Sequence, residues 1–481
     1  MAALEAGLDL KLDSLLYMPL VVKHLQNKGI FFNNYFVTIA LYCPSRVSLL
    51  TSLKKLVIAH LPDLGGYPKF INNYNKPHAS GFNGFNFLLD PYTYDYINTT
   101  YVHNHNKPVS YLGCHTTKVL MEVNGFSFLT LTPIAPYLNM NSTFGAGAGP
   151  LWIDKPIPKE CHRHLFPDAK VPHMANFNPK EPTGVSWISK LPYRSESIIE
   201  YNDHYYQQRL RALQGVDKLV NSLVTCLENS PKINNTYIIY TFNNDFYTSQ
   251  HCLPPGKTCT FNKDICVPFF IHGPGIPEGQ SQDIVTTYID IAPTLFTLAG
   301  MLLREDFDGT PMSIADGQAM LEGGLSNLGT PTVRNNTYKA VRIISQEYNL
   351  FYSVWCNNEH ELYDLNADPY QVNNLHPYAS RPSNSTAVLG FDTERVIDHI
   401  DALLLVLKSC KGRTCIKLGE VLHLAGSVVN LLEALDTEYD AFYEAQPKVS
   451  YDWCEYAYII DAEGPQTALS YRNGYSLDQW T

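Results

Sequence analysis

The sequence predicts an α/β core followed by a smaller C-terminal sheet. A helix with one apolar face, at about residues 203–229, precedes an apolar run of strand type at 237–241, and a similar run follows at 267–271. An alternation of helix and buried strand is typical of α/β sheets. From about residue 338 the chain changes to short strands that follow one another without helices, which favours a separate antiparallel sheet.

The N-terminal part predicts one broken helix, two strands and long loops. A short amphipathic helix is expected at about 13–28, and Pro19 interrupts it early because proline fits poorly inside a helix. A β-rich run at 31–39 follows. Residues 62–110 are dense in Pro, Gly, Asn and Tyr, which indicates loops. The apolar residues at 126–131 are typical of a buried strand.

The clearest helix is the one at about 203–229. Its apolar residues recur at alternating spacings of three and four, which places them on one stripe that faces a core. These residues are Leu213, Val216, Val220, Leu223 and Leu227.

The C-terminal part predicts three strands and one helix. The strands are expected at 339–344, 350–355 and 361–365, and the helix at about 393–408. One face of this helix carries Val396, Ile400, Leu403 and Leu407. We therefore divide the chain into a core at 1–337 and a C-terminal subdomain with a helical tail at 338–481.

Size and charge limit the classes of partner. The 481 residues are 45% hydrophobic, which is enough to bury a large core. The formal net charge of -11 offers no basic field to a polyanion, so we expect no nucleic acid partner. No run of 18 apolar residues occurs, so we expect no membrane span.

Signals for cellular location point in two directions. Eleven cysteines without a CxxC pair fit scattered disulfides or buried thiols, and no zinc ribbon is indicated. Five Asn-x-Ser/Thr triplets favour the secretory pathway, at Asn98, Asn141, Asn234, Asn335 and Asn384. Residues 1–7, however, lack the basic and apolar regions of a signal peptide.

Several motifs carry a family resemblance. Residues 42–46 read Tyr-Cys-Pro-Ser-Arg, which is similar to the sulfatase signature Cys-x-Pro-Ser-Arg. From about residue 13 to about 465, further stretches resemble the arylsulfatases common in fungi, at 65–70, 87–92, 133–136, 253–258, 273–279 and 361–375. The chain is identified as a member of the sulfatase family. This resemblance implies an alkaline-phosphatase-like α/β core with a mixed central sheet flanked by helices, a small sulfate ester as partner, and secretion.

The same resemblance assigns the catalytic positions. Sulfatases use a formylglycine nucleophile made from cysteine, a divalent cation that is usually calcium, cationic side chains and histidines. The nucleophile position holds Tyr42, whose phenol cannot become an aldehyde hydrate, and Cys43 lies one residue too late. Arg46 is retained where the family's arginine stabilises the nucleophile, although it also fits an ordinary ion pair in a turn.

The metal positions that the resemblance implies have lost carboxylates. The family's first Asp-Asp pair falls near Ala6 and Gly7, which have no side-chain oxygen. Its later Asp-Asn pair corresponds to Asn243 and Asn244, so Asn244 matches and Asn243 replaces an aspartate. Calcium affinity depends on anionic oxygen ligands. We therefore expect calcium binding to be weak or lost.

The remaining catalytic set is incomplete. Lys257 stands where the resemblance places the sulfate-binding lysine, whereas Tyr137 replaces the family's histidine after residues 135–136. An N-terminal strand and a segment after residue 70 are also missing relative to the family. Three hypotheses remain open: an impaired arylsulfatase, a non-catalytic relative that binds an anionic or aromatic ligand through Arg46 and Lys257, and a decayed or wrongly spliced reading frame.

Overall fold

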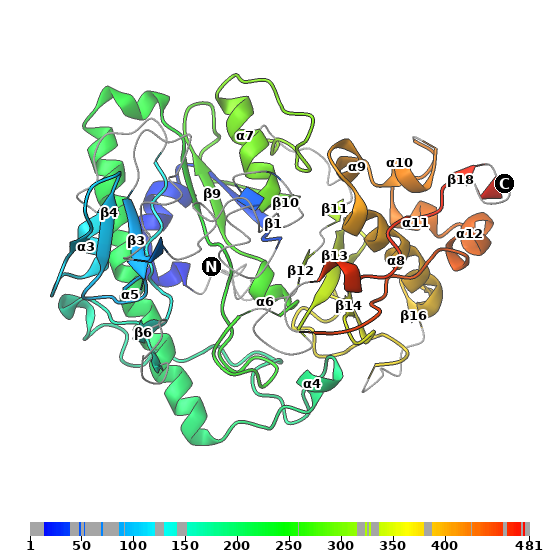
Figure 1. Ribbon diagram of the computed structural model, residues 1–481, viewed down its shortest axis with the longest axis horizontal. Helices are drawn as coiled ribbons and strands as arrows, with labels where there is room; N and C mark the ends of the chain where they lie inside the picture. Colours follow the sequence, from blue (N-terminus) through cyan, green and yellow to red (C-terminus); the bar gives the residue numbers. More distant parts are fainter. Residues whose placement is uncertain are drawn as a thin grey trace.

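The computed structural model describes residues 14–38, 48–49, 52, 69–70, 86–90, 92–120, 129–141, 152–257, 259–314, 323–324, 327–328, 336–379, 387–424, 426–455, 459–472 and 475–476 (Figure 1). Tyr42, Arg46 and residues 126–128 lie outside this set. The described end of the expected strand, residues 129–131, is not in a strand, and Leu129 is 38% exposed. The prediction of a buried strand is wrong for residues 129–131, because Leu129 and Thr130 are exposed rather than packed in a core.

The central sheet is mixed, as expected. Among the described residues its order is β10 (Gln280–Thr287), β1 (Ile30–Phe36), β9 (Phe269–His272) and β8 (Ile238–Thr241). β1 runs parallel to β10 and antiparallel to β9, and β8 runs antiparallel to β9. The strands expected at 31–39, 237–241 and 267–271 are therefore confirmed within a few residues.

One face of this sheet is covered by α5 (Glu196–Glu228), a helix of 33 residues that Figure 1 shows along the left side of the molecule. Leu213, Val216 and Val220 of the predicted stripe pack with Phe31, Ile238 and Phe270 of the sheet. Val224, rather than Leu223, continues the stripe at 1% exposure.

The broken N-terminal helix is also confirmed. It consists of η1 (Leu15–Tyr17), α1 (Pro19–Val21) and η2 (Val22–Gln26), with Pro19 at the first position of α1. The backbone amides of Leu20 and Val21 donate to Asp217 of α5 at 3.0 and 2.8 Å, which fixes α1 against the long helix.

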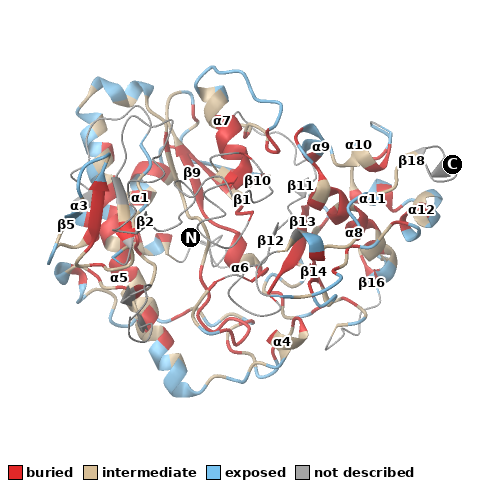
Figure 2. Ribbon diagram, in the orientation of Figure 1, coloured by how far each residue is buried: buried red, intermediate tan, exposed pale blue. Residues whose placement is uncertain are grey.

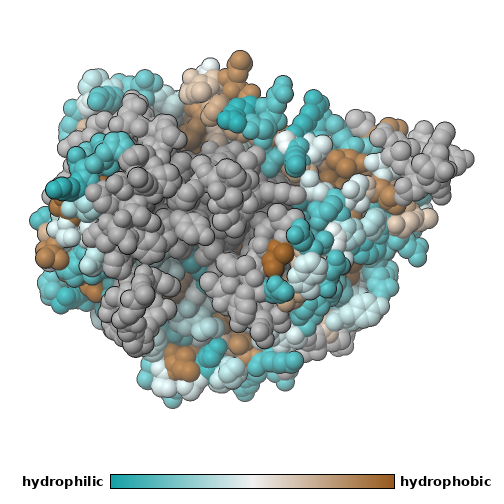
Figure 3. All heavy atoms as spheres, in the orientation of Figure 1, coloured by the Kyte–Doolittle hydropathy of each residue, from teal (hydrophilic) through white to brown (hydrophobic). Residues whose placement is uncertain are grey.

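The opposite face of the sheet is covered by α7 (Ile291–Leu298), which follows η5 (Tyr288–Asp290). Figure 2 shows buried residues concentrated in β9, β10, β1 and the inner side of α7. At the end of α7, Met301, Leu302 and Leu303 are 54%, 92% and 48% exposed. Figure 3 shows apolar surface at the upper edge of the view, where this part of the chain lies.

The C-terminal sheet is antiparallel, with the order β11 (Gly323–Gly324), β13 (Tyr338–Ile344), β14 (Asn349–Trp355) and β15 (His360–Asp364). β12 (Asn327–Leu328) also pairs with β13. The three predicted strands at 339–344, 350–355 and 361–365 correspond to β13, β14 and β15. Helix α8 (Thr393–Ser409) packs on this sheet through Val396, Ile400 and Leu404.

Shorter elements complete the described chain. A small sheet has the order β2 (Lys69–Phe70), β3 (Asn86–Asp90), β4 (Thr100–His103) and β5 (Val109–Ser110), and the hairpins are β6 (Asn139–Asn141) with β7 (Trp152–Asp154), β16 (Ala387–Val388) with β17 (Phe391–Asp392) and β18 (Tyr471–Arg472) with β19 (Tyr475–Ser476). The short helices are α3 (Thr116–Leu120), η3 (Glu160–His162), α4 (Ser186–Ser189), η4 (Pro231–Asn235), α6 (Asn262–Ile265), α9 (Arg413–Ile416), α10 (Gly419–Leu422), α11 (Leu431–Ala434), η6 (Thr437–Tyr439), α12 (Asp440–Glu444) and η7 (Ile460–Ala462). In the part of the chain that the structure describes, no helix has the length and apolarity needed to span a bilayer.

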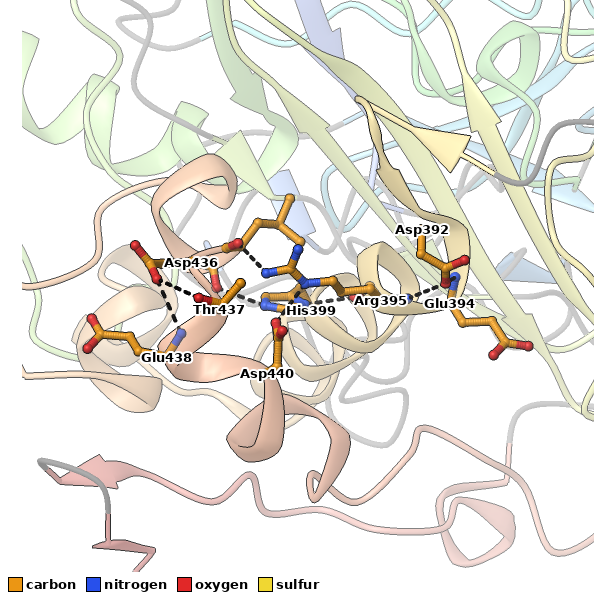
Figure 4. A network of polar contacts seen from close by, with 10 residues as sticks. Asp392, Glu394, Arg395, His399, Asp436, Thr437, Glu438 and Asp440 are labelled. Atoms are coloured by element: carbon orange, nitrogen blue, oxygen red, sulfur yellow. Dashed lines mark hydrogen bonds and ion pairs between the residues drawn. The ribbon is translucent and has the colours of Figure 1, made fainter.

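Polar contacts at the start of α8 fix it against the helices that follow (Figure 4). The Asp392 carboxylate caps α8 by accepting from the backbone amide of Glu394 at 3.0 Å. Arg395 forms an ion pair with Asp440 at 2.6 Å and donates to the Leu435 carbonyl at 2.6 Å. These contacts satisfy orphan amides and carbonyls at helix ends.

Two disulfides cross-link the C-terminal part. Cys356, just after β14, is joined to Cys454 across a sequence separation of 98, and Cys410 is joined to Cys415 across a separation of 5. Six further described cysteines take part in neither of these disulfides, namely Cys114, Cys161, Cys226, Cys252, Cys259 and Cys266.

Candidate functional site

The backbone of Lys257 is fixed in a loop between β8 and α6. Tyr247 and Gly256 exchange backbone hydrogen bonds of 2.8 and 3.0 Å, and the Tyr247 hydroxyl donates to the Lys257 carbonyl at 2.7 Å. A Cβ at Gly256 would lie 3.2 Å from the Tyr247 ring, so the tight pairing suits glycine. This loop carries Lys257 back towards the end of β8.

The Lys257 side chain contacts two of the other residues singled out in the sequence, Asn244 and Tyr137. Its ammonium nitrogen donates to Asn244 Oδ1 at 3.2 Å and lies 4.4 Å from the centroid of the Tyr137 ring. Lys257 is 9% exposed. A buried ammonium over an aromatic face gains a cation–π interaction of roughly 2 kcal/mol. Lys257 is therefore held by groups of its own chain.

Tyr137 is positioned by contacts from two other elements. The Tyr96 hydroxyl donates to the Tyr137 carbonyl at 2.7 Å. Arg209 of α5 donates through Nη1 to the Pro136 carbonyl at 3.0 Å, and its guanidinium lies 4.3 Å from the Phe246 ring centroid. Arg209 is thus a second cation beside the site. Sequence reasoning missed it because no motif surrounds it.

The two asparagines at the expected metal position follow β8 directly. Asn244 Nδ2 donates to the Asp245 carbonyl at 2.8 Å, and Asn243 is half-buried. The next carboxylate along the chain, Asp245, is already engaged. Its Oδ2 pairs with Lys263 at 3.0 Å, and its Oδ1 accepts from the Phe246 amide at 2.8 Å.

These donors do not fit a calcium ion. Calcium takes six to eight oxygens, several of them anionic, whereas the position offers two neutral amides. The Lys257 ammonium at 3.2 Å from Asn244 Oδ1 would also repel a dication there. Within the described ranges, no group of three His, Cys, Asp or Glu side chains could hold a metal ion.

The C-terminal sheet supports the far side of the Lys257 loop. The Tyr338 hydroxyl of β13 donates to the Cys259 carbonyl at 3.1 Å, and Thr260 Oγ1 donates to Glu361 Oε2 of β15 at 3.3 Å. Asp264 accepts from the Cys259 amide at 2.6 Å. Burial raises the pKa of both Glu361 and Asp264. The expected sulfatase ending at 361–375 thus begins with a residue that contacts this loop.

A buried histidine lies in the same loop. The His251 ring stacks on Phe261 with centroids 3.7 Å apart, and His251 is 1% exposed. Burial lowers the pKa of His251 to about 3. The ring is therefore neutral in the folded protein at every ordinary pH.

We expect this histidine to make the fold sensitive to acid. Its pKa is lower in the folded state, so the unfolded chain binds the extra proton and stability is lost as pH falls below about 6.5. At pH 5 the neutral His251 lowers the free energy of unfolding by about 2 kcal/mol. Urea unfolding at pH 7 and 5 should show wild type losing about 2 kcal/mol more than His251→Phe, which keeps a ring on Phe261. Equal losses in the two proteins would contradict the assignment.

The site residues predicted from the sequence therefore fall into two groups. Lys257, Tyr137 and Asn244 meet in one place, with Asn243 next to them in sequence. Tyr42 and Arg46 lie outside the described residues.

Comparisons with known proteins identify relatives of this chain. Residues 157–301 match the family model described as Sulfatase. A protein named Sulfatase ppz1 from Metarhizium majus (strain ARSEF 297) is 36% identical over 391 residues, covering 79% of this chain and 86% of the relative. An arylsulfatase from Chlamydomonas reinhardtii is 30% identical, covering 91% of this chain and 78% of the relative.

A solved structure supports the fold. It is that of a protein in complex with its substrate D-glucosamine-2-N, 6-O-disulfate, and it superposes with a TM-score of 0.56 at 17% identity, covering 75% of this chain and 88% of that protein. At this identity the likeness concerns the fold alone, and it agrees with the alkaline-phosphatase-like core expected from the sequence. The extent and identity of the Metarhizium match show that this chain belongs to the sulfatase family.

Proposed function

We propose that this sulfatase-family protein is of the arylsulfatase type and that its hydrolysis of sulfuric esters is impaired. Family membership supports sulfuric ester hydrolysis as the reaction class. The relative from Chlamydomonas reinhardtii that is named arylsulfatase supports an aryl ester as the substrate class.

The main support for impaired catalysis is the set of contacts that the Lys257 ammonium makes. A lysine that binds the sulfate group of a substrate directs its ammonium at an oxyanion. Here the ammonium nitrogen is 3.2 Å from Asn244 Oδ1 and 4.4 Å from the Tyr137 ring centroid. Both partners would have to give way before a sulfate could take their place.

The neighbouring substitutions support the same proposal. Tyr137 occupies the position at which the family has a histidine, and a phenol exchanges protons near neutral pH far less readily than an imidazole. Tyr42 occupies the position of the formylglycine precursor. In hydrolases whose residues act as a unit, loss of the nucleophile alone lowers kcat by on the order of 10⁶.

The proposal extends to the metal. Sulfatases generally use a metal ion, and we infer that calcium binds weakly or not at all to this chain. The support is chemical: Asn243 and Asn244 are neutral donors, and the Asp245 carboxylate is bonded to Lys263.

A second candidate is a non-catalytic protein that binds an anionic or aromatic ligand through Arg46 and Lys257. The position of the Lys257 ammonium against an aromatic ring favours it, because a ligand ring can replace that of Tyr137.

Hydrolysis of a chromogenic aryl sulfate with added calcium tests the proposal. We expect wild-type turnover to equal that of an Arg46→Ala, Lys257→Ala variant, with an active arylsulfatase assayed in parallel. Lys170→Ala, at an exposed lysine, is the matched control. A cooperative melting transition must accompany each assay. Turnover by wild type and Lys170→Ala that disappears in the double variant would overturn the impairment.

A further inference from the structure

One Asn-x-Ser/Thr triplet lies on an exposed turn where α5 ends. Asn234 and Asn235 close the short helix η4 (Pro231–Asn235), and Thr236 leads into β8. Asn234 and Asn235 are both exposed. Figure 3 shows hydrophilic surface at the upper left, the corner at which α5 ends in Figure 1.

The backbone conformation at this triplet leaves the Asn234 side chain exposed to solvent. Thr236 is extended, with φ -128° and ψ 127°, and its hydroxyl donates to the Lys232 carbonyl at 2.7 Å. No hydrogen bond of the Asn234 side chain occurs among the described residues. A bulky group on Asn234 Nδ2 would therefore displace no contact within the described part of the fold.

The Asn98 triplet is different. Asn98 Nδ2 donates to Asp95 Oδ2 at 3.2 Å, and its Oδ1 accepts from the Gly113 amide at 3.2 Å. Thr100, the third residue of that triplet, is 1% exposed. A group attached to Asn98 Nδ2 would crowd the Asp95 carboxylate to which this nitrogen donates, next to the buried start of β4. The side chains of the first asparagines of the other three triplets, Asn141, Asn335 and Asn384, lie outside the described set.

The disulfides indicate a compartment in which such a modification occurs. Cys356–Cys454 and Cys410–Cys415 require oxidising conditions, which the secretory pathway supplies and the cytosol does not. Five triplets in the sequence are consistent with passage through that pathway.

We propose that Asn234 carries an N-linked glycan and that Asn98 does not. In this step Asn234 Nδ2 attacks the anomeric carbon of an oligosaccharide held on a lipid pyrophosphate, which the secretory machinery supplies. A carbon–nitrogen bond forms, the carbon–oxygen bond to the pyrophosphate breaks, and the amide loses one proton. The lipid pyrophosphate leaves.

The glycan lies away from the candidate site and next to the sheet. Arg209, beside the site, and Glu228, at the end of α5, are separated by about 28 Å of helix. Among the described residues β8 is an outer strand of the central sheet, and Thr236 lies two residues before it. A glycan at Asn234 would cover the approach to this strand, and exposed strand edges promote association.

The test is peptide mass spectrometry of the full chain, expressed behind a heterologous signal sequence in a eukaryotic host. Release of glycans by an amidase in heavy-oxygen water marks each modified asparagine as a labelled aspartate. We expect the label at Asn234 and none at Asn98 in secreted protein. Cell-retained protein is measured as well, so poor secretion does not hide the result.

Point variants complete the test. Asn234→Gln and Thr236→Ala should each remove the label from this peptide, whereas Asn235→Gln should leave it unchanged. Asn98→Gln should not change the glycosylated fraction. An unlabelled Asn234 peptide in both fractions overturns the proposal, as does a labelled Asn98 in protein that is folded and secreted. None of these outcomes depends on sulfatase activity.

Discussion

Glu361→Ala is expected to lower the free energy of unfolding by at least about 4 kcal/mol. The Glu361 side chain is fully buried and accepts from four donors. These are Thr260 Oγ1 at 3.3 Å, Ser353 Oγ at 3.0 Å, Trp355 Nε1 at 2.8 Å and the Tyr363 hydroxyl at 3.0 Å. Alanine leaves all four donors buried without their acceptor, and each such group costs about 1–3 kcal/mol. Urea or thermal unfolding measures the loss.

Two further variants make this prediction specific. Glu361→Gln keeps an oxygen that can accept from three of the donors, so it should lower the free energy of unfolding by only about 1 kcal/mol. Glu444→Ala, at an exposed glutamate of α12, should change stability by less than about 0.5 kcal/mol. Equal stability of Glu361→Ala and Glu361→Gln would mean that the four contacts do not act as described.

Replacing both Cys356 and Cys454 with serine is expected to lower the free energy of unfolding by about 5 kcal/mol. A disulfide restricts the unfolded chain, and this restriction increases with the length of the loop that it closes. The separation of 98 residues gives the large value, whereas the separation of 5 between Cys410 and Cys415 gives about 2 kcal/mol by the same relation.

The second disulfide serves as the matched control. Urea unfolding of the two double-serine variants, beside the oxidised wild type, should show the larger loss of stability for the Cys356→Ser, Cys454→Ser variant. If the Cys410→Ser, Cys415→Ser variant lost as much stability as the other, loop length would not be the cause. Both variants are to be compared under conditions that prevent new disulfides.

Periodicity predicted the elements that bury one whole face. β13, β14 and α8 were found because their apolar residues repeat at the spacing of strand or helix and contact each other in the core. β10 (Gln280–Thr287) was missed because its sequence is largely polar and because, among the described strands, it lies at the edge of the sheet. Backbone pairing with β1, rather than an apolar face, holds it in the sheet.

The candidate site could be predicted only in part. The motifs indicated Lys257, Tyr137 and Asn244 separately, but nothing in the sequence indicated that the lysine would contact the other two. Arg209 of α5 lies beside the site and Glu361 of β15 contacts the far side of the Lys257 loop, although both lie far from residue 257 in sequence. Contacts of this kind depend on which elements pack together, and a local pattern indicates the apolar face of an element but not its neighbours.

The contacts of Lys257 affect how tightly an anion can bind to this lysine. A free anion that reaches this lysine competes with the Tyr137 ring and the Asn244 amide for the same charge. Giving up the contact with the ring costs roughly 2 kcal/mol, which weakens the dissociation constant about thirtyfold. Inorganic sulfate bears this cost in full, whereas an aryl anion can place its own ring over the ammonium. Under the proposed function, we therefore expect Tyr137 to make the site favour aromatic anions over small ones.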